Sequence, residues 1–132
     1  MVSKVRNNKA AFTLVEIMIV VAIIGLLAAL AIPGFVKARK QSQGRRIIND
    51  ARQMDAAIDQ WALENGKKDG DAVDTTQASS YLKTAWKNND LLGNAYGGLV
   101  AGTVGPVGTN QVQISATTKT ALANVGIDWG PY

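Results

Sequence analysis

The residue types that most often perform catalysis or hold metals are missing from this 132-residue chain. It contains no histidine and no cysteine, so neither a Ser-His-Asp nor a Cys-His site can be assembled, and no disulfide can form. Carboxylates and lysines remain, but their arrangement does not indicate an active site. We therefore expect a protein that is not an enzyme and that holds neither a cofactor nor a metal.

One charged residue stands out by its position. Glu16 lies within the apolar stretch Phe12–Val36, and the twenty residues that follow it, from Ile17 to Val36, carry no charge. A charge at the centre of a membrane helix costs about 2.5–3.5 kcal/mol on insertion scales, and less near the interface. Glu16 therefore either extends to the lipid head groups or has a partner. Its position alone leaves both possibilities open.

The N-terminal third of the chain has the composition of a membrane-inserted segment. Residues 1–11 are basic and lack acidic groups, as at the start of a secretory signal, but the apolar stretch is about twice as long as in such a signal. Twenty residues at about 1.5 Å each span roughly 30 Å, enough to cross a bilayer. Without residues 1–11 the net charge falls from +4 to +1, so the basicity mainly reflects targeting.

Small residues follow one face of this predicted membrane helix. Ala22, Gly25 and Ala29 are spaced by three and four positions, which allows a second helix to approach closely. Alternatively, alanine and glycine are simply common in membrane helices. Pro33 is expected to kink or locally open the helix.

The helical pattern continues into the polar part of the chain. Apolar residues recur there at spacings of four and three, namely Ile47, Ala51, Met54, Ile58 and Trp61. Asn65-Gly66 is a typical C-terminal stop. The pattern predicts one helix from near Thr13 to near Glu64, roughly 75 Å long, with Gly44 as a weak point.

The remaining residues predict a small mixed domain. Residues 67–76 are expected to form a loop, and Ala78 to Lys87 a short helix that turns Tyr81, Leu82, Ala85 and Trp86 inward. Tyr96–Val100 and Gln111–Ser115 are candidate strands. The expected fold class is α+β, with a small antiparallel sheet that covers the apolar side of the long helix.

The N-terminal motif resembles a known family. A small residue followed by Phe12, Thr13, Leu14, Val15 and Glu16 is similar to the signal of type IV prepilins and type II secretion pseudopilins. Gly25 and Pro33 also match the family pattern, and the resemblance extends from Lys9 to about Arg39. It implies a pilin-like fold with a leader peptide (1–11), a membrane and assembly segment (12–36) and a globular domain (37–132).

The resemblance also implies how the motif works. A prepilin peptidase would cut between Ala11 and Phe12, and the new amine of Phe12 would be methylated. Glu16 would then pair with the Phe12 amine of a neighbouring copy. This chain departs from the family at Ala11, where glycine is usual.

The implied function is that of a structural filament subunit. We expect it to be a single-pass protein of the bacterial cytoplasmic membrane, with its N-terminus inside, before it joins an extracellular or periplasmic homopolymer. Its expected partners are other copies, the peptidase and methyltransferase, an assembly platform and lipid. A type IV pilus subunit is the first reading, and a type II secretion pseudopilin, a DNA-uptake filament and a monomeric anchored module are the alternatives.

The sequence contains two weaker signals. Asp69, Asp71 and Asp74 are expected to form a solvated loop rather than a calcium site, because their spacing is not that of an EF-hand.

Five basic residues follow the apolar stretch, against three before it. The positive-inside rule alone would therefore place the C-terminal part in the cytoplasm, opposite to the motif. Contact of this basic segment with nucleic acid is not expected. The basic residues after the stretch are Lys37, Arg39, Lys40, Arg45 and Arg46.

Overall fold

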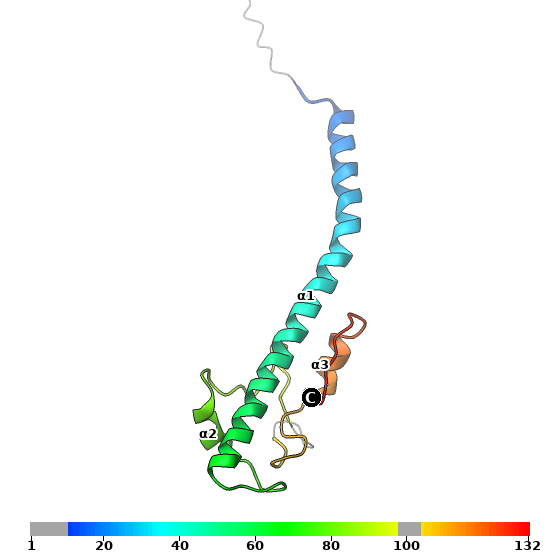
Figure 1. The fold of residues 1–132 in the computed structure, drawn as a ribbon. Helices are drawn as coiled ribbons and strands as arrows, with labels where there is room; N and C mark the ends of the chain where they lie inside the picture. Colours follow the sequence, from blue (N-terminus) through cyan, green and yellow to red (C-terminus); the bar gives the residue numbers. More distant parts are fainter. Residues whose placement is uncertain (1–10, 98–103) are drawn as a thin grey trace, which may run out of the picture. The chain divides into compact units, whose positions relative to one another are not determined.

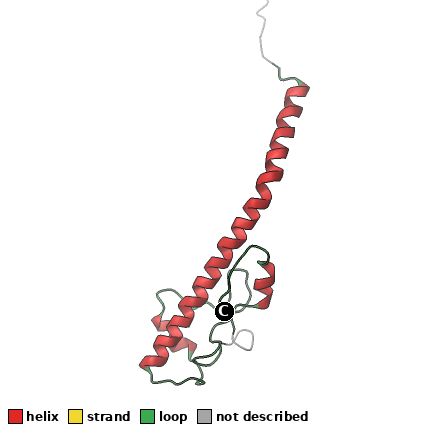
Figure 2. Ribbon diagram, turned by 45° about the vertical axis from the view of Figure 1, so that its right-hand side comes forward, coloured by secondary structure: helices red, strands yellow, loops and turns green. Residues whose placement is uncertain are grey.

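The computed structural model of the chain describes residues 11–97 and 104–132, and its regular elements are helices (Figures 1 and 2). The predicted long helix is present as α1, Leu14–Glu64. Two short elements follow one another directly, α2 (Thr75–Ala78) and the 3-10 helix η1 (Ser79–Tyr81). The last helix is α3, Ala116–Ala121.

α1 ends where the sequence predicts. Gly66 has a φ of +63°, a conformation that glycine adopts without steric cost. The backbone N–H of Lys67 donates to the carbonyl of Ala62 at 2.9 Å, and that of Gly66 to Leu63 at 3.5 Å. These two bonds satisfy carbonyls of the last helical turn, as in a Schellman motif. The helix continues without interruption through Pro33, so the predicted local opening does not break it.

The chain divides into two compact units, residues 1–36 and 37–132. In the first unit, every described residue except Ala28 is exposed, although most of the side chains are apolar. This part of α1 is long and apolar enough to cross a membrane, judged by length and composition. The second unit contains the hydrophobic core.

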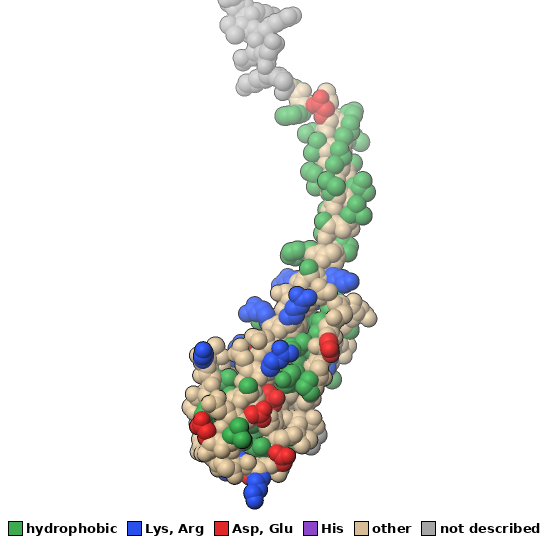
Figure 3. Space-filling model, viewed as in Figure 1, with side chains coloured by type: hydrophobic (Ala, Val, Ile, Leu, Met, Phe, Trp, Pro, Cys, Tyr) green, Lys and Arg blue, Asp and Glu red, His purple; other side chains and the backbone are tan. Residues whose placement is uncertain are grey.

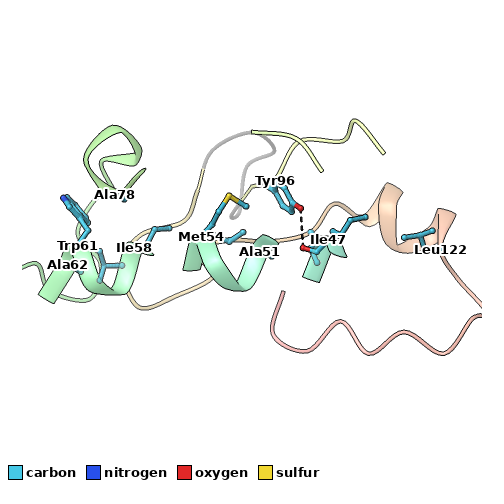
Figure 4. Close-up of a cluster of buried hydrophobic side chains, with 12 residues drawn as sticks. Ile47, Ala51, Met54, Ile58, Trp61, Ala62, Ala78, Tyr96 and Leu122 are labelled. Carbon is cyan, nitrogen blue, oxygen red and sulfur yellow. Dashed lines mark hydrogen bonds between the residues drawn. The ribbon is translucent and has the colours of Figure 1, made fainter. Parts of the chain in front are cut away.

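The core lies along the C-terminal half of α1. Each of the five residues of the predicted apolar seam, from Ile47 to Trp61, is at most 3% exposed, so that prediction is confirmed. Figure 4 shows Ala78 beside Trp61 and Tyr96 beside Ile47, and Leu122 of α3 belongs to the same cluster. The Tyr96 hydroxyl donates to the carbonyl of Ile47 at 3.4 Å. Burial of this seam requires the residues after Gly66, because α1 alone would leave it in water.

The partner of this seam differs from the prediction. Within residues 11–97 and 104–132 there is no β-strand, so the antiparallel sheet is not confirmed. Gly97 and Gln113, from the two candidate strands, form one isolated antiparallel bridge. Residues 98–100 of the first candidate lie outside the described residues. The second candidate does not extend the bridge, because Asn110 just before it turns to a φ of +48° and the surrounding segment is rich in glycine, which disfavours a ladder.

The short helix predicted over Ala78 to Lys87 begins and ends earlier. Asp74 starts α2 instead, because its carboxylate accepts the N–H groups of Thr76 and Gln77 at 3.0 and 3.2 Å, a strong N-cap. The helical turns stop at Tyr81, before Leu82 adopts an extended conformation. Three of the four side chains expected to face inward do pack on the core, whereas Ala85 is exposed.

Candidate processing and assembly site

The N-terminus of α1 is closed by a reciprocal pair of hydrogen bonds. The backbone N–H of Glu16 donates to the Thr13 hydroxyl oxygen at 3.2 Å, and the backbone N–H of Thr13 donates to the Glu16 carboxylate at 3.1 Å. Thr13 is the N-cap and Glu16 the third helical residue, so together they form a capping box. A carboxylate in the first turn also complements the positive end of the helix dipole.

This local role of Glu16 was not part of the sequence prediction, although the signal was present. Thr13 and Glu16 are three positions apart and directly precede an apolar run, which is the sequence pattern of a capping box. The carboxylate thus has a partner within its own chain as well as the predicted partner in a neighbour. It is anchored one residue away from Phe12, and both residues are exposed.

The predicted cleavage site lies outside the helix. Ala11, Phe12 and Thr13 precede α1 and adopt no regular structure, and the Phe12 side chain is 81% exposed. A peptidase must bind an extended backbone to reach a scissile bond, and at this position no helical turn has to be unwound. The residues before Ala11, including the basic ones of the predicted leader, lie outside the described residues.

The remaining residues of the predicted assembly segment are arranged along α1. Ala22, Gly25, Ala29 and Pro33 are all exposed, and a methyl group added at Gly25 would meet no atom within 4 Å. Within a single copy, therefore, the described residues leave the small-residue stripe exposed. The stripe remains a prediction about contacts with another helix.

The acidic loop serves local structure. Asp74 caps α2, and the carboxylate of Asp71 accepts the backbone N–H of Lys68 at 2.8 Å. Within the described ranges, no group of three or more acidic side chains gathers as a set of possible metal ligands.

The first unit of the chain carries a recognised motif. Residues 6–32 match the family described as the prokaryotic N-terminal methylation motif. The matched segment includes the expected cleavage site, the capping box and most of the apolar stretch. The resemblance predicted from Phe12 to Glu16 is therefore confirmed.

Similar proteins come from two kinds of assembly. The chain is 44% identical over 64 residues to the type IV major fimbrial protein FimA of Dichelobacter nodosus, covering 48% of this chain and 40% of the relative. It is 40% identical over 80 residues to fimbrial protein Q of Moraxella bovis, covering 59% and 50%. Type II secretion system core protein G of Klebsiella michiganensis is 31% identical over 62 residues, covering 47% and 44%.

These alignments cover half or less of each of the three relatives. No solved structure matches the chain.

Proposed function

We propose that this chain is the precursor of a structural subunit of a type IV pilin-like filament. The observation that carries the proposal is the motif Phe12–Glu16 at the capped start of α1, within the segment that matches the methylation motif. Cleavage between Ala11 and Phe12 and methylation of the Phe12 amine would produce the mature subunit. Its activity would come from polymerisation and not from catalysis.

The proposal includes a membrane stage before assembly. Residues 12–36 would cross the cytoplasmic membrane once, with the N-terminus inside, and residues 37–132 would form the globular domain. The exposed apolar side chains of α1 support this, since water would be an unfavourable solvent for them. In the filament, other copies would replace lipid around the stripe of Ala22, Gly25 and Ala29. The peptidase and an assembly platform would be the other partners.

The fold that goes with this function is pilin-like. The long N-terminal helix and the core along its C-terminal half support that assignment. The pairing of Gly97 with Gln113 is the only bridge within the described residues that joins the two candidate strands. It supports at most a rudimentary sheet.

A type II secretion pseudopilin is the alternative function, and the similarity to core protein G favours it. The two functions predict different phenotypes. Deletion of a pilus subunit would remove surface filaments and leave protein secretion intact. Deletion of a pseudopilin would block secretion, with surface filaments unaffected.

Glu16 provides the test of the filament mechanism. Glu16→Leu removes both the charge and the cap, whereas Glu16→Gln removes the charge but retains an acceptor for the Thr13 N–H, as glutamine does in other capping boxes. If Glu16 pairs with the Phe12 amine of a neighbour, both variants leave a buried amine unmatched. Such a loss costs about 3–5 kcal/mol, which lowers the equilibrium constant of each subunit-addition step a hundredfold or more. We expect both variants to be inserted and cleaved, and neither to form filaments.

Three outcomes separate the mechanisms. Filaments from Glu16→Gln but not from Glu16→Leu would show that the cap matters and that the charge does not. Normal filament numbers from both variants would remove the pairing mechanism altogether. A wild type that is cleaved but never polymerises would favour a monomeric anchored module. Thr13→Val, which keeps the carboxylate and removes the hydroxyl acceptor, is the matched control for the cap.

A further inference from the structure

Charge is segregated along the sequence of the second unit. Residues 37–52 contain six basic side chains and one acidic side chain, whereas residues 55–74 contain six acidic and two basic ones. Figure 3 shows basic side chains gathered on the part of α1 that follows the apolar stretch. One chain therefore presents a basic segment and an acidic segment at separate places on the same helix and the loop after it.

The basic segment has little neutralisation within the chain. Among the described residues the one ion pair joins Lys87 to Asp50 at 2.7 Å. This pair occupies Asp50, which is the only carboxylate within residues 37–52. Arg45 and Arg46 are exposed on α1 and form no ion pair with a described residue. Their guanidinium groups are free to bind a carboxylate of another molecule.

The acidic side of α1 borders a groove. Asp55 and Asp59 lie one helical turn apart, and the side-chain amide of Gln111 donates to both carboxylates, at 2.6 and 3.0 Å. The groove has a volume of about 400 Å³ and is also lined by Pro131 and Tyr132. A neutral amide satisfies one oxygen of each carboxylate but leaves both negative charges uncompensated, and they repel each other.

We propose that this groove binds the Arg45–Arg46 segment of a second copy of the chain. The inference rests on the proposed filament and names one contact within it. An arginine side chain fits the groove chemically, because its planar guanidinium can donate to two carboxylates at once. Tyr132 offers an aromatic side chain near the same position.

The contact cannot form within one chain. Arg46 and Asp59 are thirteen residues apart on α1, which separates them by roughly 20 Å along the helix. In a filament, each copy would use its groove for one neighbour and its arginines for another. Such a heterologous interface leads to a ring or an open filament, whereas two copies that exchange the contact reciprocally would form a closed dimer with twofold symmetry.

The natural absence of cysteine makes the contact testable by cross-linking. We would introduce Arg46→Cys and Asp59→Cys together in the full-length chain and treat filaments with a bis-maleimide about as long as the lost arginine side chain. The expected product is a ladder of dimers, trimers and longer species. Each single variant should remain monomeric. The pair Arg52→Cys and Asp59→Cys is the matched control, and it should give no ladder. Filaments of the double variant that give no ladder would overturn the inference.

Charge removal gives an independent measurement if the cysteine variant fails to assemble. Asp55→Asn with Asp59→Asn keeps the shapes of both side chains, and we expect it to reduce filament numbers about tenfold or more, the range measured for close interfacial charge pairs. Glu64→Gln, on the same helix but outside the groove, should have no effect. Unchanged filament numbers in the neutral variant would overturn the contact but not the filament function. Absence of filaments in the wild type would overturn both.

Discussion

At the residue scale, Ala11 and Phe12 define where the leader would be removed. Both precede α1 and are exposed, so the bond between them is accessible without unfolding. We expect mass spectrometry of the mature protein to find N-methylphenylalanine at position 12. Ala11→Gly restores the residue usual before the cleavage site and should be processed at least as fast. An intact Met1 in assembled protein, or cleavage after Ala28, would contradict the proposed processing.

Asp55 should make the stability of the second unit depend on pH. Burial raises the pKa of its carboxyl above the usual 3.8, the hydrogen bond from Gln111 lowers it, and the charge of Asp59 raises it again, with a net upward shift. The folded state therefore binds this proton more tightly than the unfolded state does. The stabilisation is present below the unfolded pKa and is lost as pH rises through the folded pKa.

This linkage can be measured by denaturation of a fragment of residues 37–132 over the range from about pH 3 to pH 7. Compared with wild type, Asp55→Asn should lack the loss of stability that accompanies ionisation of Asp55. Its advantage should therefore grow with pH over this window. Asp128→Asn, at an exposed carboxylate, is the control. A constant difference between Asp55→Asn and wild type at all pH values would show that Asp55 titrates normally.

At the element scale, Gly44 is a packing position and not only a weak point of α1. A methyl group at Gly44 would overlap the Ile127 side chain. Close by, Gln41 donates to the carbonyl of Val125 at 2.8 Å. The segment after α3 therefore approaches the helix backbone here, and a side chain on Gly44 would push it away.

A double-mutant cycle tests this approach. Gly44→Ala gains about 1 kcal/mol in helix propensity but loses about 1–3 kcal/mol by overpacking, so we expect net destabilisation in urea. In an Ile127→Ala background the overlap disappears, and the same change should stabilise the unit. Gly44→Ala that stabilises both backgrounds equally would show that Ile127 moves aside freely. Gly34→Ala, where an added methyl group meets no atom within 4 Å, is the matched control in the full-length chain.

The elements differ in how far the sequence predicts them. α1 could be predicted almost to the residue, because apolar spacing and a glycine stop are local signals. The residues after Lys67 could not, because long-range hydrogen bonds hold them instead of a periodic pattern. Buried Asp90 accepts the hydroxyl of Thr118, which lies 28 residues further along the chain. Gln111 likewise reaches α1 across more than fifty residues, and no short sequence window contains that information.

At the scale of the whole molecule, the two units have opposite relations to water. The described residues of the first expose apolar side chains almost without exception, whereas the second buries a core along the same helix. One helix thus carries a segment suited to lipid or to other copies and a segment that organises a folded domain. This division predicts that the second unit folds without the first.

A soluble fragment of residues 37–132 should therefore unfold cooperatively as a monomer. Trp61 is the most informative position in it, since the side chain is 2% exposed and its indole N–H donates to Gln77 at 3.0 Å. Trp61→Ala removes this contact between α1 and α2 and leaves a large cavity. We expect it to cost about 3–5 kcal/mol, a large share of the stability of so small a domain.

Trp61→Phe separates the two contributions. It keeps an aromatic ring in the core and removes only part of the volume and the hydrogen-bond donor, so a smaller loss of about 1–3 kcal/mol is expected. Urea denaturation, monitored by circular dichroism, gives the free energies of unfolding of both variants on one scale. If Trp61→Ala unfolds at the same urea concentration as wild type, the Trp61 side chain does not contribute to the core as described here. If both variants lose the same amount, the hydrogen bond to Gln77, and not the ring, holds α2 against the long helix.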